Sequence, residues 1–506
     1  MKKLEGIHYW IEKRAQITPN KLALIGENEQ VTYKQMSENI HKIARCLQER
    51  FLLKKGDRLG LLLPNGIDYV MILFAAAKIG SIIVPLNTRL TATELAFQVN
   101  DSQTTAIIIG KEFEDFGNEI IDRTKISSVM WLDGGLKSLL DQVQTTLREE
   151  ASLPEVDGSS AFIICYTSGT TGHPKGAVLT QENMFWNALN NQLSLDITSN
   201  DVTLTLLPLF HIGGIGLFSL PVLFMGGTVV IPSKFDTSQV LKLIEQYRIT
   251  LIMGVPTIHD SIRKDPNFHH TDLTSVRWFY SGGAPCPLEL ISFFTEKGLP
   301  FGQGFGMTET SPTVFLQTKD NYLESKGSIG KATMFTEIRV VDSTGKDVAC
   351  DEVGELWVKG PNVFKEYWNL PKETADSFKD GWFLTGDLVK KDQDGFVYIT
   401  GRKKEMIISG GENIYPLEIE QAIAKLKQVQ ETAVIGVPDD IWGEVPIAII
   451  VLHEGSTLTK KEIQEYCKQY LAKYKVPKEV HFVNALPKNA TGKIDKTLIK
   501  KQISRS

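Results

Sequence analysis

The sequence has few of the features that mark secreted, zinc-containing or nucleic-acid-binding proteins. It has only 5 cysteines among 506 residues, scattered and without a Cys-x-x-Cys pair. This argues against a disulfide framework or a zinc site and favours a reducing compartment, for which we expect the cytoplasm. The formal net charge of -5 gives no bulk attraction to nucleic acid. Basic patches interleaved with aromatic residues are also lacking, so no nucleic-acid partner is expected.

Targeting and membrane-spanning segments are scarce as well. The N-terminal stretch MKKLEGIHYWIEKRAQITPNK is charged throughout and has no apolar core of signal-peptide length. Residues 202–233 carry no Asp, Glu, Lys or Arg over a length that could span a bilayer. They contain Pro208, Pro221 and five glycines, however, so we predict a strand, a loop, a buried helix and a strand. Peripheral contact of LFSLPVLF (217–224) with a membrane stays open.

Short β-like runs alternate with helical patterns in about the first hundred residues and again later in the chain. RLGLLLP (58–64), SIIVPLN (81–87) and TAIIIG (105–110) are such runs, and the alternation resumes from residue 228 to residue 283. This order predicts largely parallel α/β sheets. The chain is also longer than one compact domain usually is, so we expect at least two domains.

The pattern changes twice towards the C-terminus. Residues 327–359 have shorter strands with turn residues between them, which predicts a small antiparallel β unit. After GFVYITGRKKE a compact α+β set of helix, two strands, helix and strand begins. We therefore predict a domain of residues 1–400, a boundary at 401–404 and a second domain of residues 405–506.

The stretch YTSGTTGHPKG (166–176) follows the apolar run AFIIC and is rich in hydrogen-bond donors. Gly169 and Gly172 let backbone N–H groups turn towards an anion, and Lys175 adds positive charge. The stretch is not a Walker A loop, because Pro174 stands where that motif requires glycine. It predicts a phosphate-binding loop, with a solvent-exposed hairpin loop as the alternative.

Seven segments in order resemble those of the adenylate-forming enzymes, which include acyl-CoA synthetases, peptide-synthetase adenylation domains and luciferases. Besides the loop above, they are LPLFH (207–211), SGGAP (281–285), GQGFGMTET (302–310), GWFLTGD (381–387), GRKKEMIISGGENIYPLEIE (401–420) and PKNATGK (487–493). The sequence is most similar to fatty-acyl-CoA and 4-coumarate-type CoA ligases. The resemblance implies a large N-terminal α/β domain that binds acid and ATP, and a small mobile α+β C-terminal domain with a catalytic lysine.

The resemblance also implies a two-step reaction. A carboxylic acid and MgATP give an acyl-adenylate and pyrophosphate, and the acyl group then passes to the thiol of coenzyme A. The implied ATP-binding residues are Thr167, Ser168, Gly169, Thr170, Thr171, Gly172, Lys175, Gly283, Ala284, Gly304, Phe305, Gly306, Met307, Thr308, Asp387, Arg402 and Lys493.

Within that set, the resemblance assigns individual roles. Glu309 is the magnesium ligand, in keeping with the preference of this cation for oxygen, and Thr308 donates to the α-phosphate. Phe305 stands where the family commonly has a tyrosine against the adenine, and it keeps the stacking face. Asp387 accepts from the ribose hydroxyls, and Arg402 belongs to the ribose or phosphate site. Turn or surface residues are the alternatives.

His211 lies by resemblance at the mouth of an acid pocket that also includes Gly213, Gly214, Gly282 and Gly306. It completes the catalytic set with Thr308, Glu309 and Lys493. It is not expected to act as a general base, because a carboxylic acid is already ionised at pH 7; a packed histidine is the alternative.

The residues around LPLFH also indicate the kind of acid. The segment HIGGIGLFSL is small and apolar, and no aspartate near LPLFH would hold a substrate amine. We therefore expect a medium- or long-chain fatty acid, with an aryl acid of the 4-coumarate or o-succinylbenzoate type as the second choice.

Lys493 lies in a turn that Asn489 and Gly492 are expected to form. The resemblance makes it the adenylation lysine, which neutralises charge as pyrophosphate leaves. Its alternative is one more solvated lysine of a lysine-rich tail. In the family the small domain rotates between the half-reactions, and the corresponding hinge residue here is Lys404.

The implied CoA-binding residues are Ser409, Gly410, Gly411, Glu412 and Trp442. Glycines there would let the pantetheine arm approach the backbone, whereas a tight turn before the next helix is the alternative. Lys473 and Lys475 could hold CoA phosphates, but a solvated face is favoured.

Other classes stay open on the sequence. Free CoA is preferred over a carrier protein, because no carrier domain is seen. A luciferase-like oxygenase would need the same site, and a catalytically silent relative would lack residues such as Lys175, Glu309 or Lys493, all of which are present. The length of the acid and the oligomeric state, including a homodimer, are not predicted.

Overall fold

The computed structural model describes residues 4–133, 135–144, 154–167, 174–489 and 492–503. The chain forms two compact units, and each of them takes two separate segments of the sequence. Unit 1 consists of Met1–Glu337 and Val358–Phe383, and unit 2 of Ile338–Trp357 and Leu384–Ser506.

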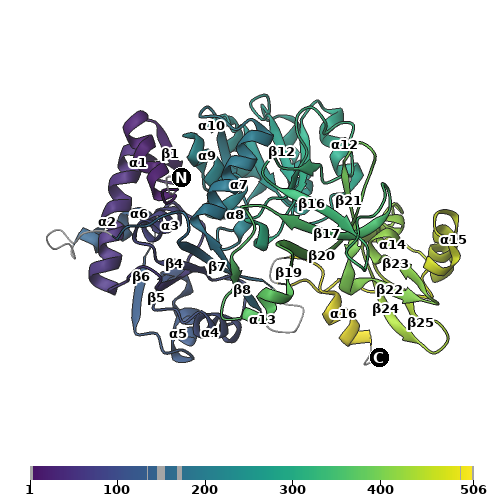
Figure 1. The fold of residues 1–506 in the computed structure, drawn as a ribbon. Coiled ribbons are helices and arrows are strands. Elements are labelled where there is room, and N and C mark those ends of the chain that lie inside the picture. The colour runs from purple at the N-terminus through teal and green to yellow at the C-terminus, as the bar shows by residue number, and fades with distance from the viewer. Residues whose placement is uncertain (1–3, 134, 145–153, 168–173, 490–491, 504–506) are drawn as a thin grey trace. The chain divides into compact units, whose positions relative to one another are not determined.

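The described part of unit 1 contains two sheets that are mostly parallel, as predicted. The first, sheet A, has the strand order β15-β14-β13-β12-β11-β9-β10-β1-β2, and its neighbours from β13 to β1 are parallel. The N-terminal strand β1 therefore lies beside strands about two hundred residues later in the chain (Figure 1). The strands of sheet A are β1 Leu22–Ile25, β2 Gln30–Thr32, β9 Val202–Thr205, β10 Thr228–Val230, β11 Leu251–Gly254, β12 Trp278–Ser281, β13 Phe301–Phe305, β14 Phe315–Leu316 and β15 Lys331–Ala332.

The second sheet of unit 1, sheet B, has the order β18-β8-β7-β4-β3-β5-β6 and is parallel from β7 to β6. Its strands are β3 Arg58–Leu62, β4 Ile82–Pro85, β5 Ala106–Gly110, β6 Ser128–Leu132, β7 Ala161–Thr167, β8 Lys175–Thr180 and β18 Glu366–Tyr367. The predicted runs at 58–64, 81–87 and 105–110 thus correspond to β3, β4 and β5.

Helices connect these strands. They are α1 His8–Ile17, α2 Tyr33–Phe51, α3 Ile67–Ile79, α4 Ala92–Asp101, α5 Glu114–Asp122, α6 Gly135–Gln144, α7 Gln181–Leu195, α8 Ile212–Gly216, α9 Ser219–Met225, α10 Thr237–Tyr247, α11 Pro256–Lys264, α12 Leu288–Glu296 and α13 Pro371–Asp376. Threonine caps begin several of them. Before α7, for example, the Thr180 side chain accepts from the Asn183 N–H, and the Asn183 side chain accepts from the Thr180 N–H, which satisfies two backbone donors at once.

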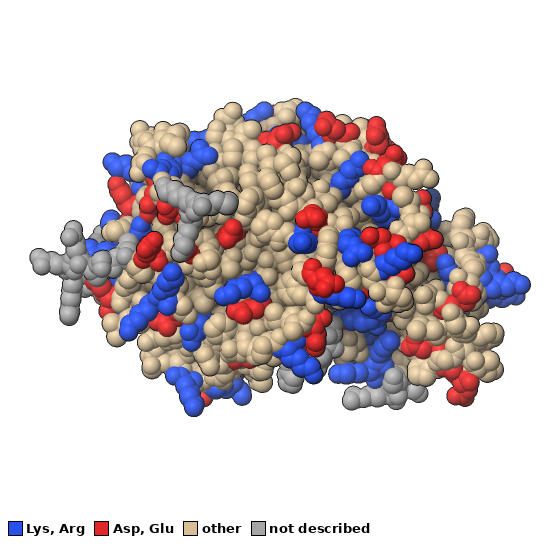
Figure 2. Space-filling model, in the orientation of Figure 1, with Lys and Arg blue, Asp and Glu red and all other residues tan. Residues whose placement is uncertain are grey.

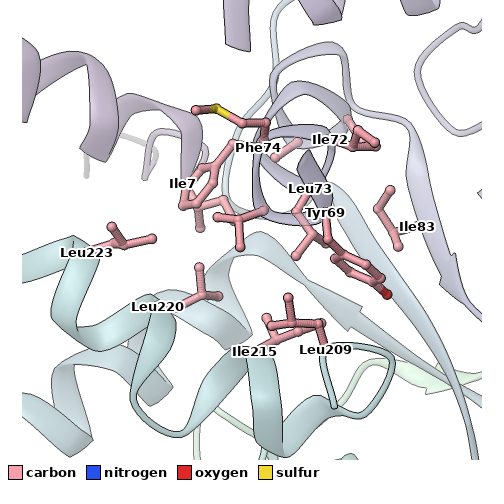
Figure 3. Close-up of a cluster of buried hydrophobic side chains, with 14 of the residues drawn as sticks. Ile7, Tyr69, Ile72, Leu73, Phe74, Ile83, Leu209, Ile215, Leu220 and Leu223 are labelled. Carbon is pink, nitrogen blue, oxygen red and sulfur yellow. The ribbon is translucent and has the colours of Figure 1, made fainter. Parts of the chain in front are cut away.

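The uncharged segment 202–233 folds as predicted into a strand, a loop, buried helices and a strand, namely β9, α8, α9 and β10. Its helices pack on α3, which is apolar on every side and therefore lies inside the unit. Figure 3 shows Tyr69 and Leu73 of α3 facing Ile215 and Leu220 of the α8–α9 segment. Among the described residues, none of the helices combines the length and apolarity that a bilayer crossing requires.

Unit 2 contains sheet D, with the order β23-β22-β25-β24 and β26 paired to β25. Its elements are β22 Ile407–Ser409, β23 Glu412–Ile414, α14 Pro416–Ile423, β24 Val429–Asp439, β25 Gly443–Leu452, α15 Lys460–Tyr470, β26 Glu479–Phe482 and α16 Lys496–Ile503. The helix, strand, strand, helix and strand predicted after residue 404 therefore occur in that order.

A further sheet, sheet C, includes the segment predicted as a small β unit. It has the order β16-β17-β20-β19, with β21 paired to β20. Its strands are β16 Glu337–Val341, β17 Val353–Lys359, β19 Phe378–Lys379, β20 Trp382–Lys391 and β21 Val397–Arg402. Most residues of β16, β17, β20 and β21 belong to unit 2, so this unit begins before residue 401. The boundary at 401–404 stays a prediction.

Charged side chains of both signs lie near one another over most of the face shown in Figure 2. Exposed ion pairs such as that of Arg248 with Asp272 contribute little to stability, because water screens them. The pair of Arg277 and Asp201 differs because Asp201 is buried and the contact is bidentate, with N–O distances of 2.7 and 2.8 Å. It fixes the start of β9 to the start of β12. All five cysteines are free thiols.

Candidate active site

Three of the predicted motifs meet at one edge of sheet A. LPLFH follows β9, SGGAP begins at the last residue of β12, and GFGMTET begins at the end of β13. Because β9, β11, β12 and β13 are parallel, their carboxyl ends lie along the same edge. In open α/β sheets this edge is where ligands bind. The fold therefore explains why motifs a hundred residues apart can serve one site.

The predicted phosphate loop connects β7 and β8. These strands form an antiparallel hairpin in which Thr167 is paired with Lys175, and the Thr167 hydroxyl donates to the Lys175 carbonyl at 3.5 Å. The loop residues Ser168, Gly169, Thr170, Thr171 and Gly172 lie outside the described residues. The hairpin is compatible with both interpretations of the sequence, because a phosphate-binding loop and a solvent-exposed hairpin loop can each connect two such strands.

Thr308 and Glu309 lie in a short 3-10 turn directly after β13, and both are buried. The Glu309 carbonyl accepts from the Phe364 N–H at 2.8 Å. Asn362 secures the end of the turn, because its side-chain amide donates to the Thr310 and Thr313 carbonyls at 3.1 and 2.7 Å. The carboxylate predicted to bind magnesium is thus held on a rigid backbone.

Glu309 and Lys175 share a neighbour, Tyr367. The Tyr367 hydroxyl donates to Glu309 Oε1 at 2.9 Å, and Lys175 Nζ lies 5.2 Å from the centre of the Tyr367 ring. One aromatic residue of β18 therefore contacts both the predicted metal ligand and the predicted phosphate-binding lysine.

The glycines of the β13 segment are required by the backbone that packs on them. A Cβ at Gly306 would lie 1.6 Å from the Pro312 carbonyl oxygen, and one at Gly304 would lie 2.6 Å from the Phe315 carbonyl oxygen. Phe305 lies between them, half-buried, with its ring 6.2 Å from that of Phe315. The next predicted residue, Met307, is half-buried and packs on the hydrophobic core.

The SGGAP segment turns away from the end of β12. Gly283 has a φ of 80°, a conformation that disfavours any residue with a Cβ, and Gly283 and Ala284 are exposed. A Cβ at Gly282 would lie 2.9 Å from the terminal methyl of Met253. The exposed turn at this edge is compatible with a nucleotide contact.

His211 caps the short helix α8. Its Nδ1 accepts from the Gly213 N–H at 3.1 Å, which requires this nitrogen to be unprotonated. The neighbouring Gly214 has a reason in packing, because a Cβ there would lie 2.2 Å from the Pro208 carbonyl oxygen. Of these two glycines, both predicted for the acid pocket, Gly213 is therefore the better candidate, because its nearest neighbours are side chains.

The remaining predicted residues belong to unit 2. Asp387 of β20 is the cross-strand partner of Arg402 of β21, and Arg402 Nε lies 2.6 Å from Asp387 Oδ1. The Thr385 hydroxyl accepts from the Asp387 N–H at 3.0 Å and donates to the Leu356 carbonyl at 2.7 Å. Asp387, predicted to bind the ribose, and Arg402, predicted for the ribose or phosphate site, are thus brought together on one hairpin.

Lys493 lies near this pair. Its backbone N–H donates to the Asn489 side chain at 3.0 Å, and its carbonyl accepts from the Asn489 N–H at 2.8 Å, so Asn489 forms the predicted turn. The pKa of Lys493 is lowered, first by partial desolvation and then by repulsion from Arg402, while Asp387 opposes the shift.

Lys404 lies in the short 3-10 turn Lys403–Glu405 and is exposed. Its flanks are held by ion pairs, from Lys403 to Glu355 at 2.9 Å and from Lys496 to Glu405 at 3.1 Å. The structure describes one arrangement of this turn, and the assignment of Lys404 as a hinge stays a prediction.

The predicted CoA residues gather around the turn between β22 and β23. Gly410 and Gly411 have φ angles of 60° and 88°, so the tight turn proposed as the alternative is present. Ser409 is buried and paired with Gly443, whereas Glu412 is exposed. The Gly410 N–H donates to the Trp442 carbonyl at 2.8 Å. Trp442 itself is 53% exposed, which leaves an aromatic face beside the turn.

Of the two lysines considered for CoA phosphates, Lys475 is already paired. Its Nζ lies 2.8 Å from both carboxylate oxygens of Glu418. Lys473 is exposed. These contacts favour a structural role for Lys475 over phosphate binding.

Sequence reasoning missed Tyr367, Asn362 and Cys165. Cys165 of β7 lies against Thr308, and burial raises the pKa of its thiol to about 12, so it packs as a neutral side chain. Tyr367 and Asn362 belong to PNVFKEYWNL (361–370), which has no chemical pattern of its own. The pairing of β18 with β8, which lies far away in the sequence, brings this segment to the site.

The described residues contain no cluster of three or more His, Cys, Asp or Glu that could hold a metal by itself. One buried carboxylate such as Glu309 nevertheless fits magnesium, which keeps several waters and binds one or two carboxylates together with substrate phosphates. The donor set therefore agrees with a magnesium ion that arrives with a nucleotide.

Comparison with known proteins identifies the enzyme family, and the full-length relatives match nearly the whole chain. The AMP-binding enzyme family matches residues 11–368, and its C-terminal domain family matches residues 418–493. A feruloyl-CoA synthase from an Amycolatopsis species is 38% identical over 98% of this chain and 99% of its own. The long-chain-fatty-acid–CoA ligase FadD13 of Mycobacterium tuberculosis is 37% identical over 99% of both chains. A Bacillus subtilis o-succinylbenzoate CoA synthetase (MenE), solved with ATP and a magnesium ion, has a TM-score of 0.87 and 35% identity over 97% of this chain and 99% of that chain.

The chain therefore belongs to the AMP-binding, adenylate-forming enzyme family. Its enzyme class is that of the acid–CoA ligases, whose substrates include ATP with magnesium and coenzyme A. The relatives differ in the acid that their names give, so the comparisons leave the acid of this chain unassigned.

Proposed function

We propose that the chain is an AMP-forming ligase that joins an apolar monocarboxylic acid, in the first place a medium- or long-chain fatty acid, to CoA. The observation that carries the proposal is the uncharged segment 202–233. It starts at β9, passes through His211 at the binding edge of sheet A and continues into the buried helices α8 and α9. A second carboxylate or an amine on the substrate would need a fixed counter-ion, and this segment offers none.

In the proposed first step, unit 1 holds the acid and MgATP. The loop from Thr167 to Lys175 binds the phosphates, Thr308 donates to the α-phosphate, and Glu309 holds magnesium, which neutralises phosphate charge. Phe305 and the turn at Gly283 contact the adenine. His211 orients the acid, whose carboxylate attacks the α-phosphorus of ATP and expels pyrophosphate. The neutral Nδ1 of His211, bound by the Gly213 N–H, supports an orienting role over proton transfer.

Unit 2 contributes Asp387 and Arg402 to the nucleotide and Lys493 to the departing pyrophosphate. Burial and, after it, the charge of Arg402 lower the pKa of Lys493, which supports a lysine whose charged form an anion would stabilise. In the second step, the CoA thiol attacks the acyl carbon and AMP leaves. Ser409, Gly410, Gly411, Glu412 and Trp442 line the approach of CoA, and residue Lys404 is the hinge between an N-terminal domain of residues 1–400 and a C-terminal domain of residues 405–506.

An aryl acid is the second candidate. The relative of 38% identity over 98% of this chain is named a feruloyl-CoA synthase. The uncharged segment 202–233 could also pack against an aromatic ring as readily as against an alkyl chain. The reaction is placed in the cytoplasm, and the free cysteines support this location.

The test is pyrophosphate release from MgATP with octanoate, palmitate, ferulate, 4-coumarate, o-succinylbenzoate and phenylalanine, each with and without CoA. We expect release with octanoate or palmitate, and a thioester only when CoA is present. Higher kcat/KM with ferulate or 4-coumarate would replace the fatty acid by the aryl acid. Preference for phenylalanine or o-succinylbenzoate would contradict the apolar monocarboxylate.

A pair of lysine variants shows whether the release belongs to this site. Lys493→Ala should abolish it, while Lys461→Ala, which removes an exposed lysine of α15, should leave it unchanged. Loss of pyrophosphate release in both variants would mean that release depends on the net charge of the protein and not on Lys493 itself.

A further inference from the structure

We propose that Tyr367 is a positioning residue for nucleotide binding, which orients the carboxylate of Glu309 through its hydroxyl and the ammonium of Lys175 through its ring. The inference rests on the roles proposed above for Glu309 and Lys175. It adds a residue from a segment to which no site motif was assigned.

The Tyr367 side chain is held by its own strand. β18 pairs with β8, the strand that begins at Lys175, with Tyr367 opposite Ala177. The Trp368 N–H donates to the Gly176 carbonyl at 2.7 Å, and the Tyr367 N–H donates to Thr374 Oγ1 at 3.0 Å. The Phe364 ring packs 4.7 Å from the Tyr367 ring. These contacts fix the ring before any ligand is bound.

The same segment holds the backbone of Glu309, because the Phe364 N–H donates to the Glu309 carbonyl at 2.8 Å. Residues 364–367 therefore fix both the main chain and, through the 2.9 Å hydrogen bond of Tyr367, the carboxylate of Glu309. Magnesium requires near-octahedral geometry at about 2.0–2.1 Å from its ligands, so the direction of a carboxylate oxygen matters. Groups that hydrogen-bond to a metal ligand typically change metal affinity by about 10- to 100-fold.

The ring of Tyr367 contacts the opposite charge. Lys175 Nζ lies 5.2 Å from the ring centre, within the range of a cation–π interaction. A phenol has a negative face and a hydroxyl that donates. The ring face of Tyr367 therefore contacts the ammonium of Lys175, and its hydroxyl donates to the carboxylate of Glu309.

Unit 2 contains a similar trio of a lysine, a tyrosine and a carboxylate further along the β20–β21 hairpin, and none of the three is a predicted site residue, so this trio provides a control. Lys390 Nζ lies 5.8 Å from the centre of the Tyr398 ring, and the Tyr398 hydroxyl donates to Asp392 Oδ2 at 3.2 Å. Removing the Tyr398 hydroxyl deletes an equivalent tyrosine–carboxylate hydrogen bond without touching Glu309.

The test is calorimetric titration of ATP into wild type, Tyr367→Phe, Tyr367→Leu and Tyr398→Phe, with magnesium and with EDTA. Tyr367→Phe keeps the ring, so ATP affinity in EDTA should stay unchanged while the gain from magnesium shrinks about 10-fold. Tyr367→Leu should also weaken ATP binding in EDTA by about 3-fold, because Lys175 loses its aromatic neighbour. Tyr398→Phe should match wild type in both buffers.

The proposal is overturned if Tyr367→Phe retains the wild-type gain from magnesium, or if Tyr398→Phe loses as much. A Tyr367→Phe variant that melts earlier and binds ATP more weakly by equal factors in both buffers would also overturn it, since it would show a purely structural role. Absence of ATP binding by wild type would be a different result, because it would refute the proposed function itself.

Discussion

His259 should make the stability of unit 1 depend on pH below neutrality. It lies in α11, fully buried, with rings of Phe279, Phe294 and Phe301 around it at 5.1 to 6.1 Å. Its Nε2 lies 2.9 Å from the Tyr280 carbonyl oxygen, so this nitrogen donates. Burial lowers the pKa of His259 from 6.5 to about 4.

The sign follows from the proton balance. Between pH 6.5 and pH 4 the unfolded chain binds a proton at His259 and the folded chain does not, so stability is complete above pH 6.5 and falls as the pH drops towards 4. A shift from 6.5 to about 4, at about 1.4 kcal/mol per pH unit, gives a loss of about 2 kcal/mol between pH 7 and pH 5. Burial raises the pKa of Asp68 to about 6, which acts in the opposite direction, so a variant must isolate the histidine.

His259→Gln keeps an amide N–H for the Tyr280 carbonyl and does not titrate. Urea unfolding of unit 1 at pH 7 and pH 5 should show that wild type loses about 2 kcal/mol more than the variant, because the contribution of Asp68 cancels in this difference. Equal losses in the two proteins would refute the reasoning, as would an NMR titration that places the pKa of His259 near 6.5.

Three further changes test the candidate site. Lys493→Ala should abolish pyrophosphate release but spare thioester formation from preformed acyl-adenylate, as measured by product chromatography; equal losses in both half-reactions would argue against separate roles for the two domains. Gly411→Val should do the reverse, because it strains a turn with a φ of 88°; an unchanged thioester rate would remove this turn from the CoA site. Gly306→Ala should destabilise the protein by about 3 kcal/mol or more, because its Cβ would lie 1.6 Å from the Pro312 oxygen; an unshifted melting temperature would mean that this loop can move away.

Local pattern was sufficient for elements whose partners are near in sequence. The run at 58–64 is recognisable as a short apolar stretch, and it occurs as β3, in which residues 59–62 are all buried. The uncharged stretch at 202–233 was assigned correctly from its prolines and glycines.

Contacts between distant segments were not predictable in the same way. Tyr367 reaches Glu309 and Lys175 through the pairing of β18 with β8 and the hydrogen bond of the Phe364 N–H to the Glu309 carbonyl, and nothing in the sequence around Tyr367 specifies these partners. Gly214 illustrates a different limit. Its lack of a side chain could suit a ligand or a neighbouring main chain, and only the position of the Pro208 carbonyl distinguishes the two.

The interleaved composition of the two units has a consequence for how parts of the enzyme could turn. The chain passes from one unit to the other at residues 337–338, 357–358 and 383–384, so a rotation of all of unit 2 would bend three covalent connections together. A rotation at Lys404 would bend only one, and it would leave β20 and β21, with Asp387 and Arg402, on the stationary side. The ribose residues and the lysine would then belong to bodies that move separately, so a cross-link between residues 402 and 493 should block only the second half-reaction.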